Sequence, residues 1–280
     1  MEVVAGPSSP LLASRIAEKL NSRLAITTYR KFPDGELYVR VQSKESKVVV
    51  VQSINSSDDL VFLMLTLDAL EGRDIIAVIP YMGYARQDRK FNEGEALSIR
   101  VVARLIENYA DGVVSVNIHS KEAARHFKKL EEIDAMPLIG KYYKNQDIVM
   151  ISPDFGSYER VKIAAKSAGC EFDYMEKTRI DAEMVEIRPK NINAEGRKVV
   201  LVDDIISTGG TMVEAAKTLE DAVTVEAACL HAVLAGYSLN RLYSAGISKI
   251  IATDTVEKCV SQISVAGLIA DRITDSFLSK

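Results

Sequence analysis

Residues 199–211 read Val-Val-Leu-Val-Asp-Asp-Ile-Ile-Ser-Thr-Gly-Gly-Thr, an apolar run followed by two acids and a small polar turn. Its first four residues are aliphatic with no polar alternation, which is typical of a strand covered on both faces in a parallel sheet. Two carboxylates, Asp203 and Asp204, end the apolar run, and a helical pattern begins at Val213 after a turn rich in hydroxyl groups and glycine. A strand, a polar turn and a helix in this order are the building unit of an α/β protein.

The turn has the composition of a phosphate site. Its glycines permit positive φ, so successive backbone N–H groups can point at one anion at the start of the helix. The two carboxylates repel a phosphate, but they can accept hydrogen bonds from vicinal ribose hydroxyls, directly or through a metal-bound water. The pattern therefore indicates a ribose 5-phosphate site whose turn consists of Ser207, Thr208, Gly209, Gly210 and Thr211. Spacing alone leaves a second interpretation open, in which the same residues only cap the helix and connect it tightly to the strand.

The composition excludes several classes of protein. The chain has 280 residues, of which 48% are hydrophobic and 26% charged, as expected of a globular protein that can form two α/β domains. No apolar stretch is long enough to cross a bilayer and no secretory signal is recognisable, so we expect a cytoplasmic protein without a membrane partner. The net charge of -4 offers no overall attraction for nucleic acid. The three cysteines are isolated and odd in number, which argues against a disulfide framework.

Strands and helices alternate in both halves of the chain. The predicted strands are Glu2–Ala5, Val48–Gln52, Ile75–Ile79, Val113–Asn117, Val149–Ser152, Val199–Val202, Val225–Leu230 and Ile250–Thr253. This alternation predicts an α/β fold of two similar tandem domains, each with a mostly parallel sheet flanked by helices. We expect the domains to span residues 1–142 and 143–280. The last helical stretch, Val265–Leu278, could pack on either half.

A different pattern appears between residues 25 and 41. Pro33, Asp34 and Gly35 form a strong turn signal. The flanking segments, Ile26–Tyr29 and Leu37–Val41, could pair as a hairpin that projects from the first domain. Such a charged hairpin is either exposed to solvent or a contact to another subunit.

A long polar loop, residues 81–95, follows the predicted strand Ile75–Ile79. Loops at the carboxyl ends of parallel strands are where α/β folds bind ligands. Arg86, Arg89 and Lys90 could bind a polyphosphate, the arginines by bidentate hydrogen bonds and the lysine as a point charge. By composition alone, a solvated charged loop fits equally well.

Four further motifs, read together, resemble one family. They are Phe-Pro-Asp-Gly-Glu-Leu at 32–37, Tyr-Ala-Arg-Gln-Asp-Arg at 84–89, Asn-Ile-His-Ser at 117–120 and Ser-Pro-Asp at 152–154. All lie where ribose-phosphate pyrophosphokinases have them, and residues 199–211 are similar to the signature of the phosphoribosyltransferase fold. The resemblance runs essentially from end to end and looks like the shorter, archaeal-type members. It implies two tandem phosphoribosyltransferase-like domains and an enzyme of nucleotide biosynthesis. That enzyme transfers the diphosphoryl group of ATP to the 1-hydroxyl of ribose 5-phosphate, giving 5-phosphoribosyl 1-diphosphate and AMP.

The resemblance implies an ATP site built from two segments. Phe32 would stack on adenine, while Asp34 and Glu36 would accept hydrogen bonds from its exocyclic amine. A neighbouring subunit would contribute this hairpin, so the resemblance also implies a homo-oligomer of at least two chains. From the polar loop the ATP-binding residues would be Arg86, Gln87 and Asp88.

A metal site and a catalytic pair are implied in the same way. His119 would coordinate the Mg²⁺ that travels with ATP, and Asp154 would belong to the same metal and ribose region. Asn117 stands where many relatives carry aspartate, and an amide binds a cation more weakly than a carboxylate does. Lys177 and Arg179 map to a Lys-x-Arg pair on a mobile loop, between the candidate strands at 171–175 and 184–188, that closes on the transferring phosphates. Phosphoryl transfer needs mainly positioning and charge neutralisation, which two cations can supply.

The resemblance gives the ribose hydroxyls to Asp203 and Asp204 and the 5-phosphate to residues 207–211. Many relatives have a third acid where this chain has Ser207, so any role of that acid is in doubt here. One alternative is a phosphoribosyltransferase, which shares the sugar site but lacks the hairpin and loop motifs. The other is a non-catalytic regulatory homologue, against which the retention of Lys177 and Arg179 argues.

Overall fold

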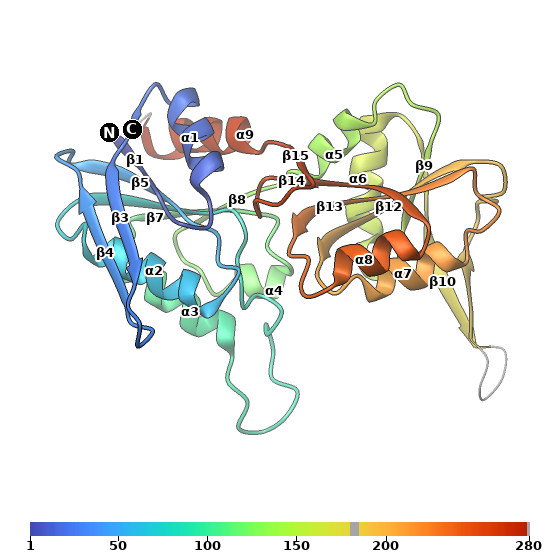
Figure 1. The fold of residues 1–280 in the computed structure, drawn as a ribbon, viewed down its shortest axis with the longest axis horizontal. Helices are drawn as coiled ribbons and strands as arrows, with labels where there is room; N and C mark the ends of the chain where they lie inside the picture. The colour runs from blue at the N-terminus through green and yellow to red at the C-terminus, as the bar shows by residue number, and fades with distance from the viewer. Residues whose placement is uncertain (180–184, 279–280) are drawn as a thin grey trace. The chain divides into compact units, whose positions relative to one another are not determined.

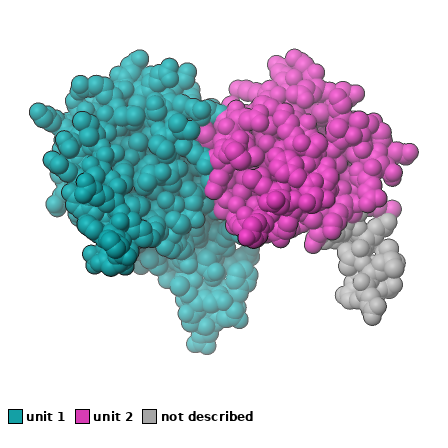
Figure 2. Space-filling model, viewed as in Figure 1, with its two compact units in different colours: residues 1–134, 255–257, 264–280 teal, residues 135–254, 258–263 magenta. Residues whose placement is uncertain are grey.

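The computed structural model describes residues 1–179 and 185–278, and the chain forms two compact units (Figures 1 and 2). Unit 1 comprises residues 1–134, 255–257 and 264–280, and unit 2 comprises residues 135–254 and 258–263. Each unit is a mostly parallel sheet with helices on both faces, so the predicted α/β class is confirmed. No helix among the described residues is long and apolar enough to cross a membrane.

The sheet of unit 1 has six strands in the order β2-β1-β5-β6-β7-β8, and every neighbouring pair is parallel. The strands are β1 (Glu2–Ala5), β2 (Arg23–Leu24), β5 (Lys47–Val51), β6 (Asp74–Ile79), β7 (Gly112–Val116) and β8 (Leu130–Ile133). The helices are α1 (Pro10–Lys19), α2 (Ser57–Asp68), α3 (Ser98–Glu107), α4 (Lys121–Ala124) and α9 (Ala266–Ile273), which continues as a π-helical turn, Thr274–Leu278. Figure 1 shows α1 and α9 on one face of the sheet and α2 and α3 on the other. With both faces covered, the central strands β5, β6 and β7 are almost entirely buried rather than alternating between buried and exposed residues.

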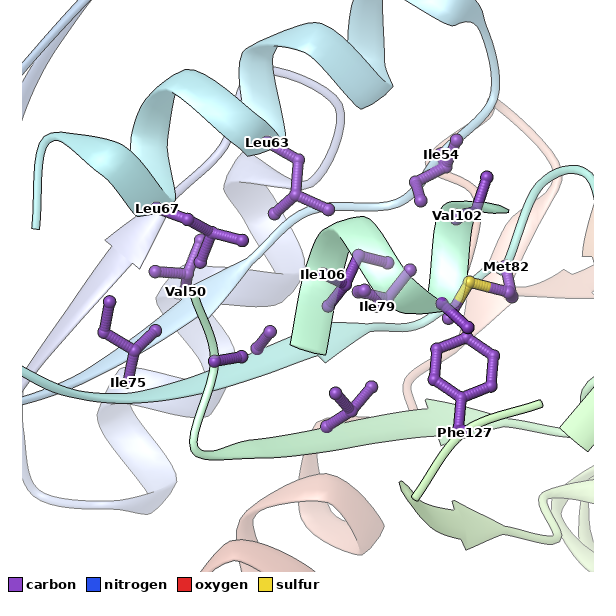
Figure 3. Close-up of a cluster of buried hydrophobic side chains, with 14 of the residues drawn as sticks. Val50, Ile54, Leu63, Leu67, Ile75, Ile79, Met82, Val102, Ile106 and Phe127 are labelled. Atoms are coloured by element: carbon purple, nitrogen blue, oxygen red, sulfur yellow. The ribbon is translucent and has the colours of Figure 1, made fainter. Parts of the chain in front are cut away.

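The core of unit 1 forms where α2 and α3 cover the sheet (Figure 3). Leu63 and Leu67 of α2 pack with Val50 and Ile75 of the sheet and with Ile106 of α3, and all five are almost fully buried. Burying one such side chain contributes about 1.5–3 kcal/mol. This core fixes the carboxyl ends of β6 and β7, from which the polar loops of unit 1 emerge.

The predicted hairpin is present in unit 1. β3 (Ile26–Lys31) and β4 (Leu37–Gln42) pair antiparallel as a separate two-stranded sheet. The turn between them closes with the Gly35 N–H donating to the Phe32 carbonyl at 2.9 Å, and its φ of 97° at Gly35 favours glycine. The hairpin is attached to α2 by an ion pair of 2.6 Å between Lys31 Nζ and Asp58 Oδ2.

The sheet of unit 2 has seven strands in the order β11-β10-β9-β12-β13-β14-β15, in which only β10 and β11 pair antiparallel. The strands are β9 (Val149–Ser152), β10 (Glu171–Arg179), β11 (Val185–Pro189), β12 (Lys198–Ile206), β13 (Thr224–Ala232), β14 (Ile247–Thr253) and β15 (Ser261–Ile263). The helices are α5 (Met136–Tyr142), α6 (Tyr158–Ala168) after a 3₁₀ turn, Phe155–Ser157, then α7 (Gly210–Lys217) and α8 (Ser238–Ser244).

The two units depart from the predicted domains, 1–142 and 143–280, at three places: residues 135–142 belong to unit 2, and residues 255–257 and 264–280 belong to unit 1. α5 belongs to unit 2, where Gly140 lies so close to α6 that an added Cβ would be 2.0 Å from the Ala164 carbonyl oxygen. The segment 264–280 returns to unit 1, where Lys47 Nζ donates to the Phe277 carbonyl at 3.1 Å. The Phe277 ring fills the space beside Gly112, at 2.2 Å from an ideal Cβ. These close contacts, rather than a linker in the sequence, define the units.

Candidate functional site

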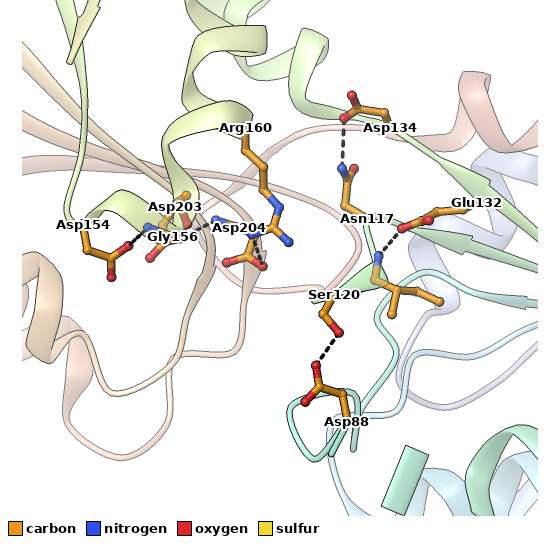
Figure 4. A network of polar contacts seen from close by, with 12 residues as sticks. Asp88, Asn117, Ser120, Glu132, Asp134, Asp154, Gly156, Arg160, Asp203 and Asp204 are labelled. Carbon is orange, nitrogen blue, oxygen red and sulfur yellow. Dashed lines mark hydrogen bonds and ion pairs between the residues drawn. The ribbon is translucent and has the colours of Figure 1, made fainter. Parts of the chain in front are cut away.

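Two neighbouring acids lie near the carboxyl end of β12, and they have different partners (Figure 4). The carboxylate of Asp203 accepts hydrogen bonds at Oδ1 from Ser157 Oγ and, at 2.8 Å, from the backbone N–H of Asp204. Asp204 Oδ2 forms an ion pair of 3.1 Å with Arg160 Nη1, and the Asp204 side chain is only 5% exposed. The strand was predicted to end before these acids, but it continues to Ile206. The reason is that β12 stays in register with β13 through the pairs Asp203 with Cys229 and Ile205 with His231.

The electrostatics of this pair are unusual for aspartates. Burial raises the pKa of Asp203, the negative charge of Asp204 raises it further, and the hydrogen bond from Ser157 acts in the opposite direction. Arg160 places one positive charge against the two carboxylates. A hydroxyl donor or a cation placed at Asp203 would therefore favour its ionised form.

The turn between β9 and α6 brings Ser157 and Arg160 to these acids. Asp154 Oδ1 accepts a hydrogen bond of 2.8 Å from the Gly156 N–H and so caps the 3₁₀ turn that leads into α6. Because β9 pairs directly with β12, this turn lies beside the acid pair at the same edge of the sheet. The sequence analysis missed both residues. Their position just after the Ser-Pro-Asp motif, at a strand end, was the signal that could have found them.

The predicted phosphate turn connects β12 to α7, and it is shorter than expected. Gly210 and Thr211 already form the first turn of α7, and Gly209 precedes them with a φ of 76°, which favours glycine. The turn is supported from α8, where Arg241 Nη2 donates to the Thr208 carbonyl. In addition, the Ala235 N–H donates to the Ser207 carbonyl at 3.1 Å. Helix N–H groups, a positive-φ glycine and a nearby guanidinium suit an anion.

In unit 1, the predicted ATP loop and the predicted metal loop meet. Asp88 Oδ2 accepts a hydrogen bond of 2.6 Å from Ser120 Oγ, and the Asp88 side chain is only 8% exposed (Figure 4). Ser120 directly follows His119, and its Oγ also accepts from the Ala123 N–H at 3.0 Å, which caps α4. The structure therefore brings the loop that carries Asp88 to the loop that carries His119.

Asn117 is held by β8 and the residue that follows it rather than oriented as an isolated ligand. Its Nδ2 donates to Asp134 Oδ1 at 2.9 Å, and the adjacent Ile118 N–H donates to Glu132 Oε1 at 2.8 Å (Figure 4). The φ of Asn117 is 38°, in the left-handed region that asparagine adopts more readily than most residues. Backbone geometry is thus one physical reason for an asparagine at this position.

The remaining ATP candidates are exposed. Phe32 is 45% exposed at the hairpin tip, with its ring centroid 6.3 Å from that of Tyr38. Asp34 and Glu36 are exposed on the same tip, where Asp34 Oδ1 accepts from the Glu36 N–H at 3.2 Å. In the polar loop Arg86 is exposed and Gln87 is half-buried.

The predicted catalytic pair lies partly outside the described structure. The backbone of Lys177 and Arg179 belongs to β10, paired with Ile187 and Val185 of β11. Their side chains, and residues 180–184 between the two strands, lie outside the described part of the chain. Among the described residues, no group of three or more His, Cys, Asp or Glu gathers as a metal site.

Comparison with known proteins matches both halves of the chain. A family model described as the N-terminal domain of ribose phosphate pyrophosphokinase matches residues 1–109, and one described as a phosphoribosyl transferase domain matches residues 126–262. "Ribose-phosphate pyrophosphokinase 2" of Archaeoglobus fulgidus is 60% identical over 275 residues, covering 98% of this chain and 100% of the relative. The ribose-phosphate pyrophosphokinase of Methanosarcina mazei is 43% identical, with 98% of this chain and 95% of the relative covered. The crystal structure of phosphoribosylpyrophosphate synthetase from Mycobacterium smegmatis is similar with a TM-score of 0.84 at 30% identity. That match covers 100% of this chain and 99% of the other.

Proposed function

This chain belongs to the ribose-phosphate pyrophosphokinase family, and we propose that it catalyses diphosphoryl transfer from ATP to ribose 5-phosphate. The 1-hydroxyl oxygen of the sugar attacks the β-phosphorus of ATP, and the bond from that phosphorus to the α,β-bridging oxygen breaks. AMP leaves, the hydroxyl proton passes to solvent, and 5-phosphoribosyl 1-diphosphate is formed. The observation that carries this proposal is the acid pair of β12, held beside the glycine turn of α7 in a chain that also bears the hairpin.

The sugar half of the reaction is assigned to unit 2. Asp203 accepts hydrogen bonds from the ribose hydroxyls, and Asp204 shares this role through its pair with Arg160. The 5-phosphate binds the N–H groups at the start of α7 and the hydroxyls of the turn, residues 207–211. The positive charges of Arg160 and Arg241 offset the repulsion that two carboxylates exert on an anionic sugar.

The ATP half is assigned to unit 1 of one chain and the hairpin of another. Arg86 contacts the phosphates, while Gln87 and Asp88 shape the loop around them; the contact between Asp88 and Ser120 holds this loop at His119. Phe32 stacks on adenine with Asp34 and Glu36 at its exocyclic amine. Exposure of the hairpin tip supports its use by a neighbouring subunit, so we propose a homo-oligomer of at least two chains.

A divalent cation, Mg²⁺, completes the proposal. The donor set fits an oxygen-preferring ion: within the described residues only Oδ1 of Asp154 receives a hydrogen bond, which leaves Oδ2 for a ligand. In unit 1, His119 would bind a cation together with waters and phosphate oxygens. When bound, the ion neutralises charge on the transferring phosphates. Lys177 and Arg179 add positive charge to the same phosphates as the transition state forms.

Nucleotide biosynthesis is the proposed role, in the cytoplasm and without a nucleic-acid or membrane partner. The phosphoribosyltransferase alternative is not favoured, because the first 109 residues match the N-terminal domain of the pyrophosphokinases. A direct activity assay distinguishes an enzyme from a non-catalytic homologue.

That assay mixes the purified chain with ATP, Mg²⁺ and ribose 5-phosphate and follows phosphorus species by NMR. The proposal predicts AMP and 5-phosphoribosyl 1-diphosphate in equal amounts, and neither product when any one component is omitted. Formation of ADP would show transfer of a single phosphoryl group and would overturn the proposal. Absence of any product from a folded protein would favour the non-catalytic homologue.

A further inference from the structure

The turn between β9 and α6 contacts both acids of β12, and its serine has an unusual role. We propose that Ser157 is a positioning residue that fixes the carboxylate of Asp203 so that its second oxygen faces the ribose hydroxyls. This inference rests on the proposed function, because it concerns how ribose 5-phosphate is recognised.

The first observation is the position of Ser157 in the helix. It occupies the N-cap of α6, where a serine hydroxyl ordinarily accepts a hydrogen bond from an N–H of the first helical turn. Within the described residues Ser157 makes no such cap bond, and its Oγ donates to Asp203 instead. The hydroxyl of this N-cap residue is therefore directed at the acid and not at the N–H groups of its own helix.

The second observation is the geometry at Asp203. Both hydrogen bonds that the described residues donate to its carboxylate reach Oδ1, from Ser157 Oγ and from the Asp204 N–H. Two donors on the same oxygen restrain the orientation of the carboxyl group. The carboxyl also has a hydrogen-bonding contact with the Asp204 side chain, and the proposal assigns Oδ2 to the ribose hydroxyls.

The third observation is the rigidity of the support. Ser157 is only 5% exposed, and it ends a 3₁₀ turn that Asp154 caps through the Gly156 N–H. In the first turn of α6, Arg160 forms an ion pair with Asp204. Because the turn holds the Ser157 hydroxyl in place, rotation of the Asp203 carboxylate would break their hydrogen bond. The contact therefore favours one orientation of that carboxylate.

The chemistry agrees with this geometry. A protonated carboxyl is a poor acceptor for a ribose hydroxyl, and burial together with the Asp204 charge raises the pKa of Asp203. The hydrogen bond from Ser157 favours the ionised form and acts against that rise. Ser157 thus supports both the orientation and the charge that ribose binding needs.

The test compares Ser157→Ala with a matched control, Ser238→Ala. Ser238 is also a fully buried serine of unit 2, but its Oγ has no hydrogen-bond partner within the described structure. Calorimetric titration of ribose 5-phosphate, without ATP, should show affinity about tenfold weaker in Ser157→Ala, as expected for the loss of one hydrogen bond to a charged group. The KM for ribose 5-phosphate should rise similarly, the KM for ATP should stay unchanged, and Ser238→Ala should match the parent protein.

Two further readouts separate positioning from general damage. The acidic limb of the pH–activity profile should move to higher pH in Ser157→Ala, because the contact that lowers the pKa of Asp203 is gone. Adding Ser157→Ala to Asp203→Asn should cause little additional loss of sugar affinity, since the serine acts through that carboxylate. Ser157→Thr, which keeps the donor, should recover part of the affinity. If Ser157→Ala does not fold, Ser157→Cys keeps the shape with a weaker donor and replaces it in every measurement.

Unchanged sugar affinity in Ser157→Ala, or a loss that adds in full to that of Asp203→Asn, would overturn the inference. Failure of the parent protein to bind ribose 5-phosphate would instead overturn the proposed function. The parent titration therefore distinguishes the two failures.

Discussion

The acid pair of β12 in unit 2 and the hairpin tip of unit 1 present their functional side chains in opposite ways. Asp203 and Asp204 are held by a serine, an arginine and a backbone N–H before any ligand arrives. Phe32 is 45% exposed, and both acids beside it are exposed too. A preorganised group loses little freedom on binding, whereas an exposed tip becomes ordered and buried only when something covers it. The contrast supports a sugar site that one chain completes and an ATP site that needs a second chain.

The largest expected effect belongs to neither binding region. Lys177→Ala should lower turnover by roughly a hundred- to a thousand-fold, because its charge acts chiefly on the transition state. Calorimetric affinities for ATP and ribose 5-phosphate should change little. Steady-state kinetics of this variant, of Arg179→Ala and of the double variant should show combined losses below the product of the single ones. An unchanged turnover with only a higher KM would assign these residues to binding.

The next effect concerns sugar binding and stability at the acid pair. Asp203→Asn should weaken ribose 5-phosphate binding by about 1–3 kcal/mol, since hydroxyls prefer a charged acceptor, and should leave ATP binding unchanged. Its unfolding midpoint at neutral pH should stay or rise. The pKa of Asp203 is raised by burial and by Asp204, so the folded state binds that proton more tightly than the unfolded chain does. Stability is therefore lost as pH rises from the ordinary aspartate range through the raised value, and asparagine removes this loss.

Asp204→Asn should behave differently in thermal unfolding. It removes the charged partner of Arg160, whose side chain is only 24% exposed, so the unfolding midpoint should fall. Equal midpoints for Asp203→Asn and Asp204→Asn would show that the two acids are not held in the distinct ways described here. Equal losses of ATP and sugar affinity would point to a shared metal role.

On the unit 1 side, Phe32→Ala should raise the KM for ATP about tenfold, because stacking of a base on an aromatic ring is worth about 1–3 kcal/mol. The KM for ribose 5-phosphate should stay the same. Tyr109→Ala, which removes an aromatic ring of similar exposure beyond the end of α3, is the matched control and should leave both constants unchanged. An equal rise of the KM for ATP in the two variants would show that Phe32 has no specific role in binding adenine.

The last prediction concerns the extent of unit 1 and affects stability alone. Gly112→Ala places a Cβ 2.2 Å from the Phe277 ring, and such overpacking should lower the free energy of unfolding by about 1–3 kcal/mol. Gly267→Ala in α9 meets no atom within 4 Å and should raise it by about 0.4–1 kcal/mol. Chemical denaturation of both variants measures the difference. If Gly112→Ala were as stable as the parent protein, Phe277 would not pack where the structure places it.

Much of the fold follows from local sequence, since all eight predicted strands are present as β1, β5, β6, β7, β9, β12, β13 and β14. The short strands β2, β8 and β15 were not predicted. They lie at sheet edges, and β8 and β15 read Leu-Glu-Glu-Ile and Ser-Gln-Ile, too polar and too short to give an apolar run. No local pattern encodes strand pairing. Pairing with β13 is the reason that β12 continues past its two acids instead of ending before them.

The candidate site divides in a similar way. Asp203, Asp204 and the glycine turn could be found because their chemistry is contiguous in sequence. Ser157 and Arg160 were missed: they follow the Ser-Pro-Asp motif closely in sequence, but only the pairing of β9 with β12 brings them to the acids. Likewise, the contact of Asp88 with Ser120 joins loops that are 32 residues apart. The assignments of Lys177 and Arg179 stay predictions.

Subunit complementation tests most directly whether one chain completes the sugar site and two chains complete the ATP site. Lys177→Ala protein, which has an intact hairpin, is mixed with a variant altered at Phe32, Asp34 and Glu36, which has an intact Lys177. Each preparation alone should have only a small residual activity, and subunit exchange is followed by fluorescence transfer between labelled chains. Activity should return as exchange proceeds, because some mixed oligomers combine an intact hairpin from one chain with an intact catalytic pair from the other. Complete exchange without any recovery would show that each chain builds its own ATP site and would contradict the account.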